Sequence, residues 1–245
     1  LEDCDALSLA ESISIASDIA AGLAALRGAG LVHGDLATRN ILIDRDGRAV
    51  IADFGSALRE GQRAESLSDR SASPEHLQGK PVTLLSDFFA LGLLLYQMVV
   101  GQHPFERDEK IDAMRLSRGL VDTSDLETLP EPIAQAMKDL LVSLLAADPA
   151  QRPATTFDLR DRLRALRRDL PAPAGLGARA RRLEARSLED GQGGAPRLPA
   201  QLIHLPWFRQ AGAAFLAFCR RGSTGSRALV VAVSVSPVIL GALLL

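Results

Sequence analysis

The sequence contains little of several residue types that mark particular classes of protein. Its 245 residues include two cysteines, Cys4 and Cys219, which are too few and too far apart for a disulfide framework or a cysteine zinc site. Aromatic residues make up 4% and the net charge is −2, so the chain offers neither a stacking platform for bases nor a basic field. We therefore expect no nucleic-acid partner.

Charge is missing from the last stretch of the sequence. Residues 228–245 contain no Asp, Glu, Lys or Arg, and as a helix they would span about 27 Å, close to the thickness of bilayer hydrocarbon. Arg220, Arg221 and Arg227 precede this segment, and the positive-inside rule then places the preceding chain in the cytoplasm. We expect a single-pass protein of the cell membrane; the alternative is a buried terminal helix.

The rest of the composition fits one compact domain with additional segments. Hydrophobic residues make up 47% and charged residues 24% of the chain, which allows a sizeable core. Apolar residues at helical spacing predict helices at 9–27, 84–100, 132–147 and 155–168. We expect a domain at 1–170, a linker rich in proline, glycine and arginine at 171–200, an interfacial helix at 201–227 and a transmembrane helix at 228–245.

Two short motifs indicate the chemistry. Residues 33–40 read His-Gly-Asp-Leu-Ala-Thr-Arg-Asn, and residues 53–55 read Asp-Phe-Gly. Transfer of a phosphoryl group from ATP needs a carboxylate that orients the attacking hydroxyl, and oxygen ligands for the magnesium ion that neutralises the phosphates. Asp35, Asn40 and Asp53 can supply these groups, so the pair of motifs predicts phosphoryl transfer.

A predicted hairpin would bring the two motifs together. Asp46-Gly47 lies between two short apolar runs, and this dipeptide is typical of tight hairpin turns because glycine accepts a positive φ. Asn40 precedes the first run and Asp53 follows the second, so both should lie at the open end of the hairpin. The next segment, 56–70, is polar and rich in serine, and is predicted to be a mobile loop.

This arrangement resembles the catalytic and magnesium-binding loops of the protein kinase superfamily. The first loop alone also resembles small-molecule kinases of the aminoglycoside and choline phosphotransferase type. Residues 73–105 favour the protein kinases, because they are similar to that family in carrying a Ser-Pro-Glu triplet, then an aspartate at the start of a buried helix, Asp87, and then a Gly-x-x-Pro-Phe turn. The resemblance covers about 9–170 and implies a fold that is mainly α with a small β-hairpin region, the C-terminal lobe of a kinase similar to bacterial membrane serine/threonine kinases.

The resemblance implies a role for each candidate site residue. Asp35 would accept or orient the proton of the hydroxyl on a protein substrate, and Asn40 and Asp53 would bind Mg²⁺ and, with it, ATP. Arg39 would stabilise the transferred phosphate; the alternative is a solvated surface arginine.

The resemblance also implies three structural contacts. Asp87 would bind the backbone of the catalytic loop, which corresponds to residues 33–40. Glu75, in the Ser-Pro-Glu triplet, would pair with Arg152, since a buried glutamate without a partner is costly. His33 and Phe54 would stack within the interior.

Two departures from the family pattern bear on regulation and substrate. Gly34 stands where many kinases have the arginine that receives an activation-loop phosphate, so we expect no switch by a phosphate at that site. Ala37 replaces the lysine usual in serine/threonine kinases, and Arg39 is placed as in many tyrosine kinases. Ser68, however, stands where a serine/threonine kinase has threonine, and we favour serine/threonine specificity.

The sequence lacks the N-terminal lobe, the part of the fold with which the family binds the phosphates of ATP opposite the catalytic loop. It contains no glycine-rich loop and no Val-Ala-x-Lys strand upstream of the first helix. Leu1 is not an initiator methionine, so we expect further polypeptide before it and little activity from the chain alone. Three hypotheses remain: a catalytic protein kinase lobe, a non-catalytic kinase-derived interaction module, and a small-molecule kinase.

Overall fold

The computed structural model describes residues 7–44, 46–64, 70–108, 110–173 and 175–178. Four predictions concern residues outside these ranges: the helix at 201–227, the transmembrane helix at 228–245, the state of the two cysteines and the position of Ser68. Among the described residues the fold is rich in helices, and its strands form three two-stranded sheets.

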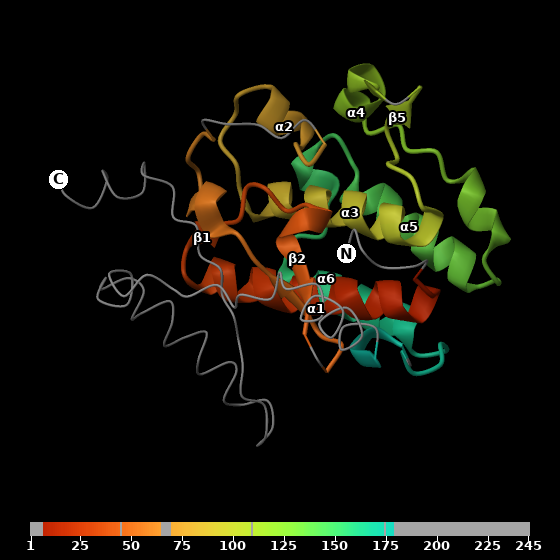
Figure 1. The fold of residues 1–245 in the computed structure, drawn as a ribbon. Helices are drawn as coiled ribbons and strands as arrows, with labels where there is room; N and C mark the ends of the chain where they lie inside the picture. The colour runs from red at the N-terminus through yellow and green to blue at the C-terminus, as the bar shows by residue number, and fades with distance from the viewer. Residues whose placement is uncertain (1–6, 45, 65–69, 109, 174, 179–245) are drawn as a thin grey trace, which may run out of the picture.

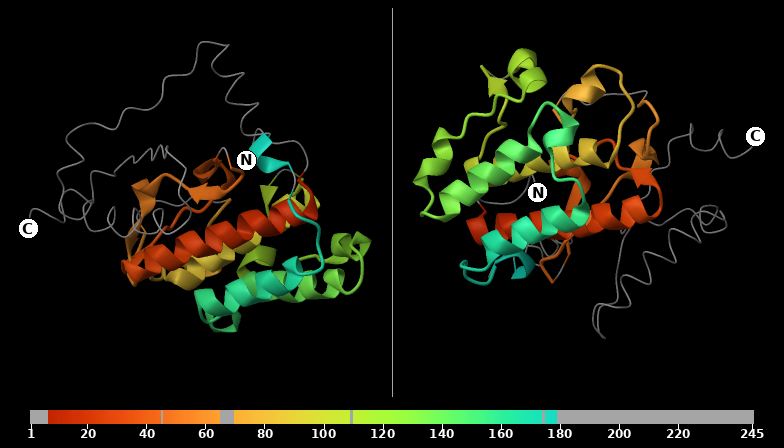
Figure 2. Two further views of the ribbon diagram at one scale, coloured as in Figure 1. Left: turned by 90° about the horizontal axis from the view of Figure 1, so that it is seen from below. Right: turned by 180° about the vertical axis from the view of Figure 1, so that it is seen from behind.

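Long helices build the body of the molecule. They are α1 (Leu9–Gly28), α3 (Leu84–Val100), α5 (Ile133–Leu144) and α6 (Thr156–Arg167), and all four confirm predicted helices. Figures 1 and 2 show α6 running alongside α1, and α3 also packs against α1. Side chains at Ile13, Ile19, Phe88 and Leu91 are fully buried between these helices. The hydrophobic core therefore lies where α1, α3 and α6 meet.

Side-chain caps define where the helices begin. Ser8 and Glu11 form a capping box at the start of α1, and Thr83 and Ser86 form another at the start of α3, so in each case two backbone N–H groups at the helix end are satisfied. Thr155 caps α6 by accepting from the Asp158 amide. Polar residues just before apolar runs thus set these boundaries.

Helix α1 is apolar enough to raise the question of a membrane span. Among the described residues it is the one helix with the length and composition to cross a bilayer, but half of its apolar window is buried inside the molecule. Ile15 and Leu23 are fully buried there. The apolar character of α1 is accounted for by its place in the core.

The predicted hairpin is present. Strands β2 (Ile41–Ile43) and β3 (Ala49–Ile51) pair antiparallel, with Ile41 opposite Ile51. Gly47 in the turn has φ +84°, a conformation that glycine adopts without strain. The register places Asn40 just before β2 and directly beside the residues that follow β3.

Several short elements complete the fold. Leu31–Val32, a short apolar run typical of a strand, forms β1 as expected. It pairs with β4 (Leu58–Arg59), which was not predicted, so the prediction of a loop throughout 56–70 was wrong at β4. Beyond α3, β5 (Glu106–Arg107) pairs with β6 (Lys110–Ile111). The other short elements are α2 (Pro74–Leu77), α4 (Ala113–Arg118), η1 (Thr38–Asn40), η2 (Phe54–Ser56), η3 (Ser124–Thr128) and η4 (Pro149–Gln151).

Packing also continues past residue 170, the predicted end of the domain. Leu176 is 4% exposed and belongs to the main core. The neighbouring Gly177 lies so close to the hairpin turn that a Cβ on Gly47 would come within 2.7 Å of the Gly177 nitrogen. The first part of the predicted linker is therefore packed against the hairpin.

Candidate active site

A buried carboxylate in α3 anchors the loop that carries the first motif. Asp87 is 1% exposed, and its two oxygens accept hydrogen bonds from the backbone N–H groups of His33 (2.8 Å) and Gly34 (3.0 Å). Burial raises the pKa of Asp87 to about 7, although both hydrogen bonds lower it. Gly34 has φ +77°, where a Cβ would meet the Ser56 carbonyl oxygen at 3.0 Å. The backbone contact implied for Asp87 is thus present.

The histidine of the motif connects this loop to the end of the hairpin. His33 is fully buried, and its Nε2 lies 3.2 Å from the Ala52 carbonyl oxygen, while its Nδ1 accepts from the Asp35 amide at 3.4 Å. These partners place the proton on Nε2, and burial lowers the His33 pKa, which favours the neutral ring. Phe54 contacts the ring edge-on, with centroids 5.4 Å apart. The loop and the residues after β3 therefore form one packed unit.

Three side chains surround the Asp35 carboxylate. Arg39 donates from Nη2 to Oδ2 at 2.6 Å, and Asn40 donates from Nδ2 to the same oxygen at 3.2 Å. Ser71 donates from Oγ to the other oxygen, Oδ1, at 2.8 Å. Asp35, Arg39 and Asn40 are thus brought together as the motif predicts. The contact from Ser71 was missed, because it joins residues 36 apart and nothing in the local sequence indicates it.

Two side chains with oxygen atoms that suit a cation, Asn40 and Asp53, lie at the open end of the hairpin. Asn40 uses its Nδ2 for the Asp35 carbonyl oxygen (2.7 Å), and this fixes the amide so that Oδ1 faces away as an acceptor. The Ala52 amide donates to the Asn40 carbonyl oxygen at 2.8 Å, which places the next residue, Asp53, across from Asn40. Asp53 is exposed, with φ 57°. An exposed carboxylate and an amide oxygen suit Mg²⁺.

A cation at this place would need additional oxygen ligands. Within the described ranges, no group of three or more His, Cys, Asp or Glu side chains is positioned to hold a metal ion. Magnesium in phosphoryl-transfer sites keeps waters and binds substrate phosphates, together with one or two carboxylates. Asp53 and Asn40 therefore fit the protein share of such a site, with phosphate oxygens or water completing it.

A buried ion pair supports the segment that leads from Ser71 into α2. Arg152 donates to both oxygens of Glu75, from Nη1 at 2.7 Å and from Nη2 at 2.9 Å, and the Ser86 hydroxyl donates to the first oxygen at 2.8 Å. Burial alone would raise the pKa of Glu75, but the hydrogen bonds and the charge of Arg152 outweigh it and lower the pKa. The predicted pairing of Glu75 with Arg152 is confirmed.

Comparison with known proteins agrees with this geometry. The family pattern described as protein kinase domain matches residues 1–162. Protein kinase C delta type from Rattus norvegicus is 32% identical over 165 residues, which are 65% of this chain and 24% of that protein. Rhodopsin kinase GRK1 from Rattus norvegicus is 34% identical over 160 residues, 63% of this chain and 28% of the relative.

A bacterial relative shows the same extent of similarity. The Lactococcus lactis protein named "Probable serine/threonine-protein kinase PknB" is 28% identical over 148 residues, 58% of this chain and 23% of that protein. The chain thus spans about a quarter of the length of the curated relatives that it matches. The family pattern covers well over half of the sequence, and the chain therefore belongs to the protein kinase domain family.

Proposed function

We propose that this chain carries the catalytic residues of an ATP-dependent protein kinase that phosphorylates serine or threonine hydroxyl groups. The observation that carries the proposal is the Asp35 carboxylate, which is held by Arg39, Asn40 and Ser71 beside the oxygen donors of Asn40 and Asp53. A partly exposed carboxylate next to a pair of cation ligands is the arrangement that phosphoryl transfer requires.

In the proposed reaction the hydroxyl oxygen of the substrate attacks the γ-phosphorus of ATP, the bond to the β,γ-bridging oxygen breaks, and ADP leaves. Asp35 orients the hydroxyl group and receives its proton. Magnesium, when bound, neutralises the charge on the phosphates. Asn40 and Asp53 would bind the ion through their side-chain oxygens. Arg39, already hydrogen-bonded to Asp35, would place positive charge beside the transferred group.

Two considerations favour a protein substrate with serine or threonine over the alternatives. The similarity extends through the Ser-Pro-Glu triplet and its partner Arg152, the part of the sequence by which protein kinases differ from small-molecule kinases. The bacterial relative is named a serine/threonine-protein kinase. The retained Asp35, Asn40 and Asp53 favour catalysis over a purely structural module.

A phosphoryl-transfer assay that compares the protein with its Asp35→Asn variant tests the proposal. The protein translated from the whole reading frame that contains this sequence would be incubated with Mg²⁺ and γ-labelled ATP, with protein and small-molecule acceptors offered separately. Asp35→Asn keeps the shape of the side chain but removes the base, and transfer should fall about a hundredfold or more. Phosphoamino acid analysis would identify the accepting residue.

Asp139→Asn provides the matched control. Asp139 is an exposed carboxylate on α5 that accepts from Gln135 at 2.7 Å, and the same change there should leave transfer unaltered. Equal activity of Asp35→Asn and the unchanged protein would refute the assignment. Transfer to amino alcohols or sugars but not to proteins would support the small-molecule alternative instead.

A further inference from the structure

A small pocket lies between the residues that follow Asp35 in the catalytic loop, α3 and the segment before α2. Its volume is about 100 Å³. The floor consists of leucines that are almost fully buried, among them Leu93 and Leu94 at 2% exposure. Arg39, in the catalytic loop, and Arg70, in the segment before α2, also line this pocket. Because Arg39 also donates to Asp35, a group bound here would lie near the residue proposed to orient the substrate hydroxyl.

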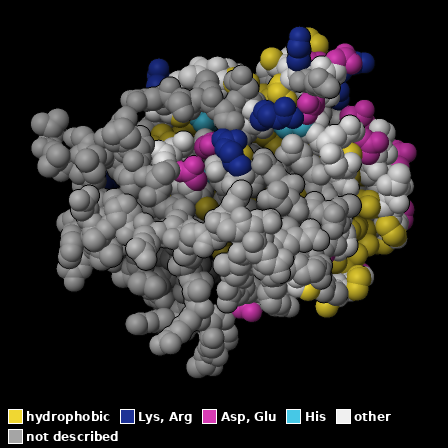
Figure 3. Space-filling model, viewed as in Figure 1, with side chains coloured by type: hydrophobic (Ala, Val, Ile, Leu, Met, Phe, Trp, Pro, Cys, Tyr) yellow, Lys and Arg dark blue, Asp and Glu magenta, His cyan; other side chains and the backbone are white. Residues whose placement is uncertain are grey.

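The described lining of this pocket carries positive charge and no carboxylate. Arg39 and Arg70 are its charged residues, and the polar residues Thr38 and Gln97 complete its polar part. The two arginine side chains are 48% and 58% exposed. Figure 3 shows basic side chains next to acidic ones on the upper part of this face, which carries α2, α4 and β5 in Figure 1.

Both guanidinium groups are held in place from outside the pocket. Arg39 donates to Asp35, and Arg70 donates to Glu106 in β5. The backbone carbonyl of Arg70 is also held, because the buried His103 ring places Nε2 3.1 Å from that oxygen. Among the described residues, each guanidinium uses one of its five N–H donors in an ion pair, so each retains donors for another anion.

We propose that this pocket binds an anionic group of the protein substrate, a carboxylate or a phosphate ester close to the accepting hydroxyl, and that Arg70 is a specificity-determining residue. The inference rests on the proposed function, since it concerns the substrate of the same site. Two arginines fixed by ion pairs lose little side-chain entropy on binding, and a guanidinium binds carboxylate or phosphate in a fork geometry. A cationic substrate side chain would meet two guanidinium groups and no carboxylate in the described lining.

Peptide binding without ATP tests the pocket separately from catalysis. Fluorescein-labelled peptides would each contain one acceptor serine and differ in the flanking residues, which would be glutamate, phosphoserine, alanine or lysine. Fluorescence anisotropy should show tighter binding of the glutamate and phosphoserine peptides than of the alanine peptide, by about fivefold to tenfold, and the weakest binding for the lysine peptide. High salt should reduce these differences.

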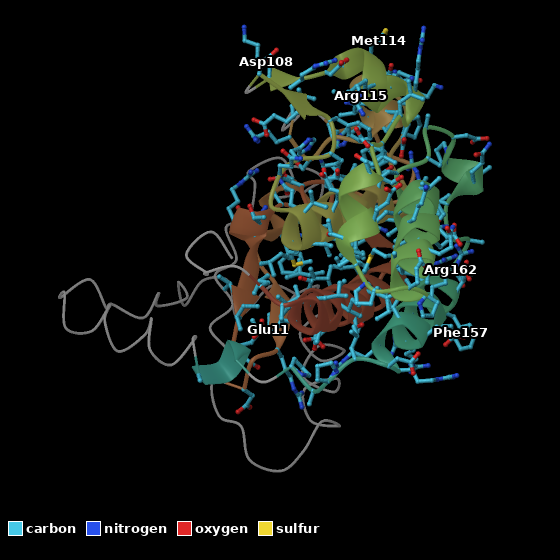
Figure 4. The ribbon with its side chains drawn as sticks, turned by 90° about the vertical axis from the view of Figure 1, so that its right-hand side faces the viewer. Glu11, Asp108, Met114, Arg115, Phe157 and Arg162 are labelled. Atoms are coloured by element: carbon cyan, nitrogen blue, oxygen red, sulfur yellow. The ribbon has the colours of Figure 1, made fainter. Side chains whose placement is uncertain are left out.

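Substitution of Arg70 should remove the preference. Arg70→Gln removes the charge, and the anionic peptides should then bind no more than about twofold tighter than the alanine peptide; Arg70→Lys should retain most of the preference. Arg162→Gln is the matched control, because Arg162, labelled in Figure 4, lies on α6. It forms a comparable partly exposed ion pair with Asp158. That variant should bind all four peptides as the unchanged protein does.

The outcomes separate the pocket from the kinase activity. Equal affinity of the unchanged protein for the glutamate, alanine and lysine peptides would overturn the pocket assignment even if every peptide were phosphorylated. The same loss of preference in Arg162→Gln as in Arg70→Gln would also overturn it. Absence of transfer to any peptide, with the binding preference intact, would refute the proposed kinase function and leave the anion pocket supported. Tighter binding of phosphoserine than glutamate would identify a phosphate ester as the favoured ligand.

Discussion

Removal of Arg152 should destabilise the fold more than loss of any surface ion pair. Its side chain is 0% exposed, and its guanidinium donates to both Glu75 oxygens and to the backbone carbonyls of Leu85 (2.8 Å) and Ala146 (3.0 Å). It also lies 4.9 Å from the centroid of the Phe89 ring. One side chain thus joins the first turn of α3, the residues just after α5 and the triplet that contains Glu75.

The magnitude follows from what Arg152→Ala leaves behind. Glu75 would be a buried carboxylate without its cation, several carbonyl groups would lose a donor, and a cavity would open beside Phe89. Breaking a buried ion pair from one side costs about 3–5 kcal/mol, which is a large part of the total stability of a typical domain. The double variant Glu75→Ala/Arg152→Ala should cost less than the sum of the two single changes, because neither charge is left unpaired.

Urea-induced unfolding followed by circular dichroism would measure these free energies. Arg164→Ala is the control, because Arg164 pairs with Asp161 on the surface of α6 at 64% and 47% exposure, and such pairs contribute less than about 1 kcal/mol. An Arg152→Ala variant that is no less stable than Arg164→Ala would refute the reasoning. So would strict additivity of the Glu75 and Arg152 changes, since that would mean the two side chains do not interact.

Two further predictions concern α3. Gly92→Ala should destabilise the protein by about 1–2 kcal/mol, because the new Cβ would lie 2.8 Å from the Leu144 Cβ. Gly28→Ala is the control, because no atom lies within 4 Å of the new Cβ, and this change should be neutral or slightly stabilising. Thermal unfolding of the two variants would measure the difference, and equal melting temperatures would contradict the close packing at Gly92. For Asp87, a folded pKa of about 7 against 3.8 in the unfolded chain means that the folded state binds the extra proton between these values. Its contribution to stability is then fully present below about pH 4 and lost as the pH rises through about 7, a change of up to about 4 kcal/mol. Unfolding of the protein and of Asp87→Asn from pH 4 to 8 should show this slope in their difference, and a flat difference would exclude the raised pKa.

The sequence predicted those parts of the fold in which local pattern and tertiary packing agree. The periodic apolar residues of Leu84–Val100 lie between a threonine cap and Gly101, which has φ +89°, and the helix occupies the predicted range. Strands of two residues, such as Leu58–Arg59 and Glu106–Arg107, are too short to show an alternating pattern. They exist because a partner strand is nearby, which is information that only the folded chain contains.

In the candidate site too, the local contacts were predicted and the contacts between distant parts of the sequence were not. The loop spacing brought Asp35, Arg39 and Asn40 together through contacts four or five residues apart, which the local backbone fixes. Ser71 reaches Asp35 from 36 residues away, and Arg70 reaches the pocket with it. Their positions depend on the contact between the segment before α2 and the catalytic loop. A polar, serine-rich sequence has no hydrophobic periodicity from which such a contact could be predicted.

In the proposed reaction, the contacts of Asp35 would also limit how a substrate can approach. A carboxylate offers about four lone-pair positions, and Arg39, Asn40 and Ser71 account for three of them here. The Ser71 hydroxyl makes the same kind of contact with Oδ1 that an accepting serine or threonine must make with this carboxylate. An incoming hydroxyl group must therefore take the remaining position or displace Ser71. Since Arg70 precedes Ser71 and lines the adjacent pocket, an anionic side chain bound there would place its own neighbouring hydroxyl beside Asp35, and the two contacts would be made by one segment of substrate.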